Sequence, residues 1–325
     1  MNAIQVENLK RVYQAQTGII RRKTKEVVAV DGIDFAVPQG ELFGLLGPNG
    51  AGKTTMVKML TTLLTPTAGS ARVLDLDVVG EAGKIRPRIG FIFGGERGLY
   101  WRLSGYDNLV YFANLYHVAP DVQKKRIPQL LELVGLKGRG DEKVQGYSRG
   151  MKQRLHVARA LIHDPELLFL DEPTMGLDPV GARELRQVIR DLQARNKTIL
   201  LTTHYMFEAD ALCQRIAVIH KGKLVALDTP EGLKRFAQDL SVVEFEIFGL
   251  PPEALDCIKA LSGVNMVSVE NREQKQALRV HTVNGASMVA PIVNTLNGLG
   301  LRVDNVVVRE PTLEDAYVRL VGGKT

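Results

Sequence analysis

A short glycine-rich segment in the first quarter of the chain has the residue types and spacing needed to hold phosphate groups. It comprises Gly47, Pro48, Asn49, Gly50, Ala51, Gly52, Lys53 and Thr54, and Thr55 follows it. The apolar run 42–46 before it indicates a buried strand, and the run 55–64 after it is typical of a helix. Glycines let successive backbone N–H groups turn toward phosphate oxygens, and the following helix adds the positive end of its dipole. These features predict a phosphate site and disfavour the alternative, a chance glycine-rich turn.

Two side chains of this segment and two acids further along have distinct expected roles. The ammonium group of Lys53 is expected to bridge the β- and γ-phosphates of a nucleotide, and the hydroxyl group of Thr54 to bind Mg²⁺. The apolar run 167–170 ends in Asp171 and Glu172. A strand there would deliver the Asp171 carboxylate to the sheet edge where Mg²⁺ lies, and Glu172 would accept a proton from an attacking water. Taken alone, an ordinary turn with two acids is the alternative.

The elements needed to position these residues alternate along the first part of the chain. Apolar runs at 42–46, 167–170 and 198–201 are typical of buried strands, and the run 183–193 has helical spacing. This order predicts an α/β fold with a largely parallel sheet covered by helices.

The pattern changes near residue 240. Alternating apolar and acidic residues at 243–247 begin a β-α-β-β-α-β order, which predicts a small, ferredoxin-like α+β domain. Thr312 and Asp315 are spaced for a capping box at the start of a terminal helix. We therefore expect two domains, 1–238 and 239–325.

Composition restricts the class of protein. The chain has 325 residues, of which 45% are hydrophobic and 24% charged, and no apolar run is long enough for a membrane span. The N-terminus has no secretory signal, and Cys213 and Cys257 are expected to be reduced thiols in a cytoplasmic protein. The net charge of +6 is compatible with binding to nucleic acid or to an anionic membrane surface, but it requires neither. The basic run 21–25 is either a solvated hairpin tip or a contact to acidic lipid headgroups.

Residues 1 to about 235 resemble the ATP-binding subunits of ABC transporters, a class of P-loop NTPase. The specific feature is the segment 147–155, Tyr-Ser-Arg-Gly-Met-Lys-Gln-Arg-Leu, which is similar to the family's signature motif. Ser148 and the N–H groups near Gly150 offer donors at a helix N-terminus, suited to a γ-phosphate. In the family that phosphate belongs to ATP held by a partner subunit, so the resemblance implies a dimer. Arg149 and Met151 stand where the commonest motif has glycine and glutamine.

Three further segments match the family. Residues 175–178 resemble the D-loop, which ends in Asp178 and passes between subunits. His204 matches the switch histidine that contacts the γ-phosphate, and Tyr13 matches the aromatic residue that stacks on adenine. Without the resemblance, the alternative for His204 is a structural histidine, and the alternative for Tyr13 is a tyrosine of the hydrophobic core. The resemblance also implies a helical subdomain near residues 95–160.

One departure concerns the glutamine that the family places after the strand 88–93, where it touches Mg²⁺ and links the nucleotide site to the permease. Gly94 stands at that position and has no side-chain ligand to offer. Our hypothesis is that Glu96 reaches the metal or its water instead. Trp101, the only tryptophan of the chain, follows in a region that borders the permease-docking groove in the family. This tryptophan could serve either to dock the permease or to pack the helical subdomain locally.

The last part of the chain resembles the domain appended to ABC-2 type ATPases, the class that includes drug and polysaccharide exporters. The segment 310–317, Glu-Pro-Thr-Leu-Glu-Asp-Ala-Tyr, is similar to their usual ending. The resemblance implies an ATPase that binds ATP and Mg²⁺, pairs with a second copy and drives an integral membrane permease from the cytoplasmic face, with no nucleic-acid partner. The alternatives are an ABC ATPase that acts on ribosomes or nucleic acid, and a regulatory module that binds ATP but hydrolyses it weakly.

Overall fold

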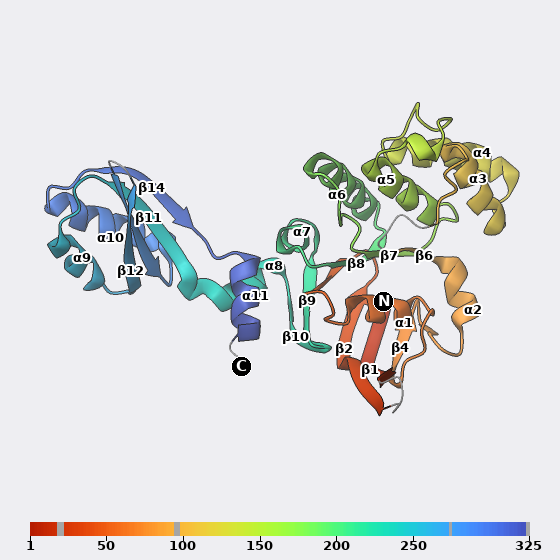
Figure 1. Ribbon diagram of the computed structural model, residues 1–325, viewed down its shortest axis with the longest axis horizontal. Coiled ribbons are helices and arrows are strands. Elements are labelled where there is room, and N and C mark those ends of the chain that lie inside the picture. The colour runs from red at the N-terminus through yellow and green to blue at the C-terminus, as the bar shows by residue number, and fades with distance from the viewer. Residues whose placement is uncertain (18–22, 94–97, 273–274, 323–325) are drawn as a thin grey trace. The chain divides into compact units, whose positions relative to one another are not determined.

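The chain forms two compact units, Met1–Thr229 and Pro230–Thr325 (Figure 1). The computed structural model describes residues 1–17, 23–93, 98–272 and 275–322. The sequence led us to expect a boundary after residue 238. The structure divides the chain earlier, after Thr229. Two short helices, α8 (Pro230–Lys234) and η3 (Arg235–Leu240), belong to the second unit because both pack against α11 (Leu313–Gly322) near the end of the chain. Of the helices in the described ranges, none is long and apolar enough to cross a membrane.

A six-stranded sheet lies at the centre of the first unit, in the order β10-β9-β3-β8-β7-β6. Its strands are β3 (Leu42–Leu46), β6 (Ile89–Ile92), β7 (Leu167–Asp171), β8 (Thr198–Thr203), β9 (Arg215–His220) and β10 (Lys223–Asp228). All neighbouring pairs except β9 and β10 are parallel, which confirms the predicted parallel sheet. β3, β7 and β8 are buried along their whole length, as expected of strands in such a sheet.

The first unit also contains an antiparallel sheet, of which the sequence suggested only a possible hairpin around residues 21–25. Its order is β2-β1-β4-β5. Its strands are β1 (Asn2–Thr17), β2 (Lys23–Pro38), β4 (Ala68–Val73) and β5 (Leu76–Asp77). Side chains from both sheets form one core, to which this sheet contributes Ile4, Ile33 and Phe35. Phe35 stacks on Phe43 of β3 with ring centroids 5.3 Å apart, so the two sheets are packed against each other through large apolar side chains.

The helices of the first unit fall into two sets. Between β6 and β7, α3 (Gly105–Leu115), α4 (Pro120–Leu133) and α5 (Arg149–Ala160) contact one another and form a separate group in Figure 1, in the stretch where a helical subdomain is expected. The remaining helices are α1 (Lys53–Leu60), α2 (Ala82–Ile85), η1 (Arg86–Arg88), η2 (Val144–Gly146), α6 (Pro179–Ala194) and α7 (Met206–Leu212). Of these, α1 begins within the glycine-rich segment, at Lys53, and α6 and α7 follow β7 and β8.

The second unit contains a four-stranded antiparallel sheet in the order β12-β13-β11-β14. Its elements are β11 (Ser241–Ile247), α9 (Pro252–Lys259), β12 (Val264–Arg272), β13 (Lys275–Thr282), α10 (Gly285–Gly298) and β14 (Val303–Arg309). Ile258 of α9 and Ile292 of α10 join Phe245 of β11 in its core. This is the predicted ferredoxin-like arrangement. The predicted capping box also forms, because Asp315 N donates to Thr312 Oγ1 at 3.2 Å and Thr312 N donates to Asp315 Oδ2 at 2.8 Å.

Candidate functional site

The loop between β3 and α1 owes its shape to three glycines. A Cβ atom on Gly47 would collide with the carbonyl oxygen of Ile219, and one on Gly52 with that of Ala29. Gly50 has open space at this point, but its φ of +80° is one that residues with side chains rarely adopt. The loop leads directly into the first turn of α1, where a helix leaves backbone N–H donors without partners. These donors and the helix dipole favour an anion.

The side chain of Lys53 is held inside this loop and is only 4% exposed. Its Nζ donates to Gly47 O at 2.7 Å and to Pro48 O at 3.2 Å, and it lies 3.1 Å from Glu172 Oε1. The ammonium group adjoins a cavity of about 310 Å³. The residues lining that cavity are Tyr13, Val27, Ala29, Asn49, Gly50, Gly52, Lys53, Thr54, Thr55 and Glu172. A buried cation beside a loop of N–H donors fits the phosphate groups of a nucleotide.

Asp171, at the end of β7, is buried, and each of its carboxylate oxygens accepts one hydrogen bond. Thr54 Oγ1 donates to Asp171 Oδ2 at 2.9 Å, and the hydroxyl group of Thr202 donates to Oδ1. A hydroxyl and a carboxylate side by side are the oxygen ligands that Mg²⁺ accepts, usually together with phosphate oxygens and water. Within the described ranges, no cluster of three or more His, Cys, Asp or Glu residues could hold a metal alone. The residues present therefore fit a magnesium ion that shares its ligands with a bound nucleotide.

Glu172 lies between the loop lysine and the histidine that follows β8. Its Oε1 is 3.1 Å from Lys53 Nζ, and its Oε2 is 3.1 Å from His204 Nδ1. Its backbone has a φ of +48°, which costs a non-glycine residue of order 1–3 kcal/mol. This conformation is held by its N–H, which donates to Thr202 O at 3.0 Å. The carboxylate is thus fixed at the mouth of the phosphate loop.

Tyr13 lies at the edge of the same cavity. It pairs with Val27 across β1 and β2, and its side chain is 36% exposed. The Arg11 guanidinium group lies 4.9 Å from the centroid of its ring. A ring with this exposure is available to stack on a flat base, whereas a core tyrosine would be enclosed.

The signature segment forms a separate cluster. Ser148 is the N-cap of α5, and its Oγ accepts from Met151 N at 3.2 Å. Gly150 is buried against α6, where an added Cβ would lie 3.5 Å from the Cα of Gly181. Among the described residues, none from 147–151 lines the cavity around Lys53. Direct contacts thus join the loop, both acids and His204, whereas the described residues of the signature segment do not line the cavity around Lys53.

Arg149 contacts the segment that resembles the D-loop. Its guanidinium group occupies the space where a side chain on Gly176 would lie, and Gly176 has a φ of +71°. Asp178 ends that segment as the N-cap of α6, because its Oδ1 accepts from Gly181 N at 2.9 Å. The sequence did not reveal that Arg149 and Gly176 are in contact.

One residue of the site was not predicted from the sequence, and two others lie outside the described residues. Thr202 was not singled out, although its hydroxyl group contacts both Asp171 and the N–H of Glu172. The only indication in the sequence is its place two residues before the histidine. The hypothesis that Glu96 replaces the missing glutamine, and the position of Gly94 itself, lie outside the described residues.

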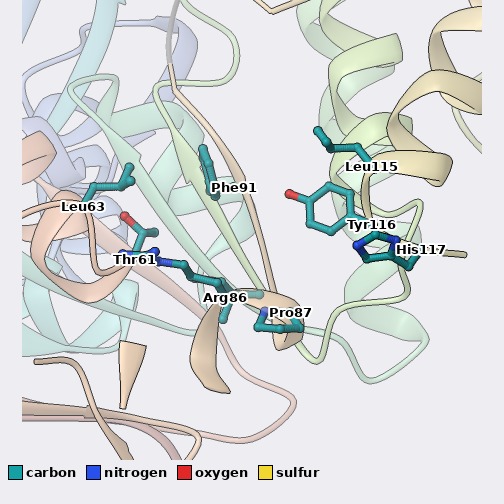
Figure 2. A pocket seen from close by; sticks show the side chains of 9 residues that line it. Thr61, Leu63, Arg86, Pro87, Phe91, Leu115, Tyr116 and His117 are labelled. Atoms are coloured by element: carbon teal, nitrogen blue, oxygen red, sulfur yellow. The ribbon is translucent and has the colours of Figure 1, made fainter. Parts of the chain in front are cut away.

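A larger cavity, of about 550 Å³, lies on the first unit and shares no lining residue with the cavity around Lys53 (Figure 2). The residues lining it are Thr61, Leu63, Arg86, Pro87, Ile89, Phe91, Leu115, Tyr116 and His117. Figure 2 shows Phe91 and Arg86 facing Leu115 and Tyr116 across it. The Tyr116 ring is held by stacking on His163 with centroids 4.0 Å apart. A largely apolar cavity in which the Tyr116 ring is held in place suits an apolar segment of another protein.

Comparisons with known proteins agree with this geometry. A family model described as "ABC transporter" matches residues 30–175. The daunorubicin resistance ATP-binding protein DrrA2 of Streptomyces coeruleorubidus is 38% identical over 315 residues, 96% of each chain. The Nod factor export ATP-binding protein I of Neorhizobium galegae is 38% identical over 309 residues, 95% of this chain and 84% of that one. A solved structure, of an ATP-binding subunit of an ABC transporter, has a TM-score of 0.61 at 27% identity, over 72% of this chain and 92% of that one.

These relatives align with almost the whole chain, including the second unit, and their names describe ATP-binding proteins. They do not favour the alternatives of a ribosome-directed ATPase or a regulatory module. The predicted family and fold are confirmed. The phosphate loop, the acidic pair and the match to these relatives lead to one conclusion: the chain belongs to the ABC transporter family and is one of its ATP-binding ATPase subunits.

Proposed function

We propose that this chain is the motor subunit of an ABC-2 type exporter. It binds ATP with Mg²⁺, pairs with a second copy and drives a separate integral membrane permease from the cytoplasmic face of the membrane. The observation that carries the proposal is the position of Glu172, held between Lys53 and His204 at a cavity of about 310 Å³.

The nucleotide binds along the phosphate loop. Tyr13 stacks on the adenine ring, and the backbone N–H groups of the loop and the Lys53 ammonium group bind the phosphates. The loop residues with this role are Gly47, Pro48, Asn49, Gly50, Ala51, Gly52, Lys53, Thr54 and Thr55. This binding mode is supported by the cavity of about 310 Å³, because Tyr13, Lys53 and most of the loop residues line it together.

Thr54 and Asp171 would hold Mg²⁺. When bound, this ion neutralises part of the charge on the β- and γ-phosphates. The hydrogen bond between Thr54 Oγ1 and Asp171 Oδ2 supports this pairing, because it places both oxygen atoms within reach of one small cation.

Hydrolysis needs a base for the attacking water, and Glu172 is the carboxylate placed to accept its proton. His204 contacts Glu172 through Nδ1, and this contact orients the carboxylate. The fixed backbone of Glu172 adds to the orientation, because a base held in one position loses little entropy when the reaction occurs.

A second copy completes the site. Ser148 and Arg149 are exposed at the start of α5, and the described residues of their segment do not line the cavity of their own chain. Ser148, Arg149, Gly150 and Met151 therefore bind the γ-phosphate of ATP held by the other copy, and Asp178 lies at the contact between the two copies. A two-fold symmetric dimer supplies both contacts at once.

The permease docks at the cavity of about 550 Å³, and Trp101 offers a further aromatic contact. The ring of Trp101 is 50% exposed, with Lys152 Nζ 5.1 Å from its centroid, so a partner can reach it. Export is favoured because full-length relatives are named for drug resistance and for Nod factor export.

Purification of the tagged full chain from washed membranes of its native cell tests this proposal. A multi-span membrane protein should co-purify with the wild-type chain. Leu115→Asp, which places a charge in the large cavity, should abolish that association and leave ATP binding unchanged. Leu299→Asp, at an exposed apolar position of the second unit, is the matched control. Recovery of the wild-type chain with ribosomes or nucleic acid instead would refute the transporter function.

A further inference from the structure

Glu208 is a buried carboxyl group that has no part in the steps above. It lies in the first turn of α7 and is 1% exposed. Neither of its carboxyl oxygens makes a well-formed hydrogen bond to a described residue. Buried polar groups without partners are rare in native structures, and an unpaired buried carboxylate is especially costly. Such a group calls for a functional explanation.

Two threonine hydroxyl groups lie beside this carboxyl group. They belong to Thr203, the last residue of β8, and to Thr174, in the loop after β7. Both threonines are buried. Thr203 directly precedes His204, and Thr174 directly precedes the segment 175–178. The Glu208 carboxyl group therefore lies between the loop that carries the histidine and the loop that ends at Asp178.

Burial makes the neutral form of this carboxyl group more favourable than it is in an exposed glutamate. Burial raises the pKa of Glu208, and the neighbouring Thr203 and Thr174 hydroxyl groups, Arg186 and His204 offset only part of that rise. A neutral carboxyl group has one O–H donor and one free carbonyl acceptor. It can therefore donate to one threonine hydroxyl and accept from the other, which a carboxylate cannot do.

We propose that Glu208 is a positioning residue for ATP hydrolysis, whose carboxyl group links Thr203 to Thr174 and so fixes His204 relative to the loop that ends at Asp178. This inference rests on the proposed function of the site. The link joins the residue that orients Glu172 to the segment that meets the second copy. The link should act on the rate of the chemical step, because His204 contacts the carboxylate of Glu172.

The test is steady-state ATP hydrolysis by the purified full chain, with Tm measured for each variant. Glu208→Ala removes the link and should lower kcat roughly 10- to 100-fold, with the KM for ATP unchanged, since small misplacements of catalytic groups have effects of this size. Glu208→Gln keeps a donor and an acceptor without a charge, and should restore kcat to within about twofold of the wild type.

A second buried acid gives the matched control. Glu41 accepts two hydrogen bonds from Arg215, at 2.7 and 2.9 Å, so it acts as a carboxylate. Glu41→Gln should lower Tm by roughly 5 °C or more, because it weakens a partly buried ion pair. Glu208→Gln should not lower Tm. The difference in Tm between the two variants distinguishes Glu208, as a neutral buried acid, from Glu41, as a charged one.

Two results would overturn the positioning role. One is a Glu208→Ala variant with a lowered Tm but wild-type kcat in its folded state, which would make the residue merely structural. The other is a Glu208→Gln variant as slow as Glu208→Ala, which would show that the charge is needed. Glu172→Gln is assayed alongside. If the wild-type chain hydrolyses ATP no faster than Glu172→Gln, the proposed function fails, and the positioning role fails with it.

Discussion

Glutamine at position 172 would keep the shape of the glutamate and remove its ability to accept a proton. The side chain is held by Lys53 Nζ and His204 Nδ1, each 3.1 Å from one of its oxygens. Both residues have a Cβ atom, so the backbone strain at φ +48° is the same before and after the change. Lys53 retains the carbonyl oxygens of Gly47 and Pro48 as acceptors. The local fold should therefore survive in Glu172→Gln.

The size of the effect follows from the role of a general base. Such a base contributes about 10²- to 10⁴-fold, which at 1.36 kcal/mol per tenfold is about 2.7–5.4 kcal/mol of transition-state stabilisation. The loss occurs only in the transition state, so kcat should fall while ATP binding is retained. ATP should then remain bound and uncleaved.

Release of inorganic phosphate and binding of labelled ATP measure the two properties separately. Glu166→Gln is the control, because Glu166 is a surface carboxylate bonded to Arg88 at 2.6 and 2.8 Å on the face where β6 and β7 begin. It should leave both properties unchanged. A Glu172→Gln rate within about tenfold of the wild type would refute the assignment of Glu172 as the base.

Three further predictions concern the loop, the docking region and the signature segment. Gly52→Ala should abolish ATP binding, measured with a fluorescent ATP analogue, because the new methyl group has no room beside β2. Trp101→Ala should impair transport by the reconstituted transporter more than ATP hydrolysis in solution, and equal losses would count against docking. Gly176→Ala should slow ATP hydrolysis more in the wild type than in an Arg149→Gly background, because its methyl group displaces the guanidinium group. Gly138→Ala, with a φ of +79° and open space, is the control for strain, and equal slowing in both backgrounds would show that the pair does not interact.

Sequence reasoning could predict those residues whose chemistry requires a fixed spacing. The phosphate loop needs glycines at set places, and Asp171 must follow an apolar strand, so both are visible as patterns. The same holds for the parallel sheet, whose buried strands are continuous apolar runs. Cys213 and Cys257 are free cysteines in the structure.

Other features depend on contacts between distant residues and leave no local pattern. Most of the antiparallel sheet was missed because β1 and β2 pair with several register shifts, and Asn8 has a φ of +46° within β1, so strict alternation is lost. The first residues of the second unit were misplaced because they join it through contacts with α11, at the far end of the chain. The burial of Glu208 and the contact of Arg149 with Gly176 likewise arise only when separate loops meet.

The most direct test of the central claim, ATP hydrolysis at a site completed by a second copy, is a mixing experiment with two inactive variants. Lys53→Ala removes the phosphate-loop cation, and Ser148→Ala removes the hydroxyl group offered to the other copy. Each variant alone should be inactive. A mixed dimer has one site with both changes and one intact site, so random pairing should restore about a quarter of the wild-type rate. A mixture no more active than its separate components would contradict the shared site.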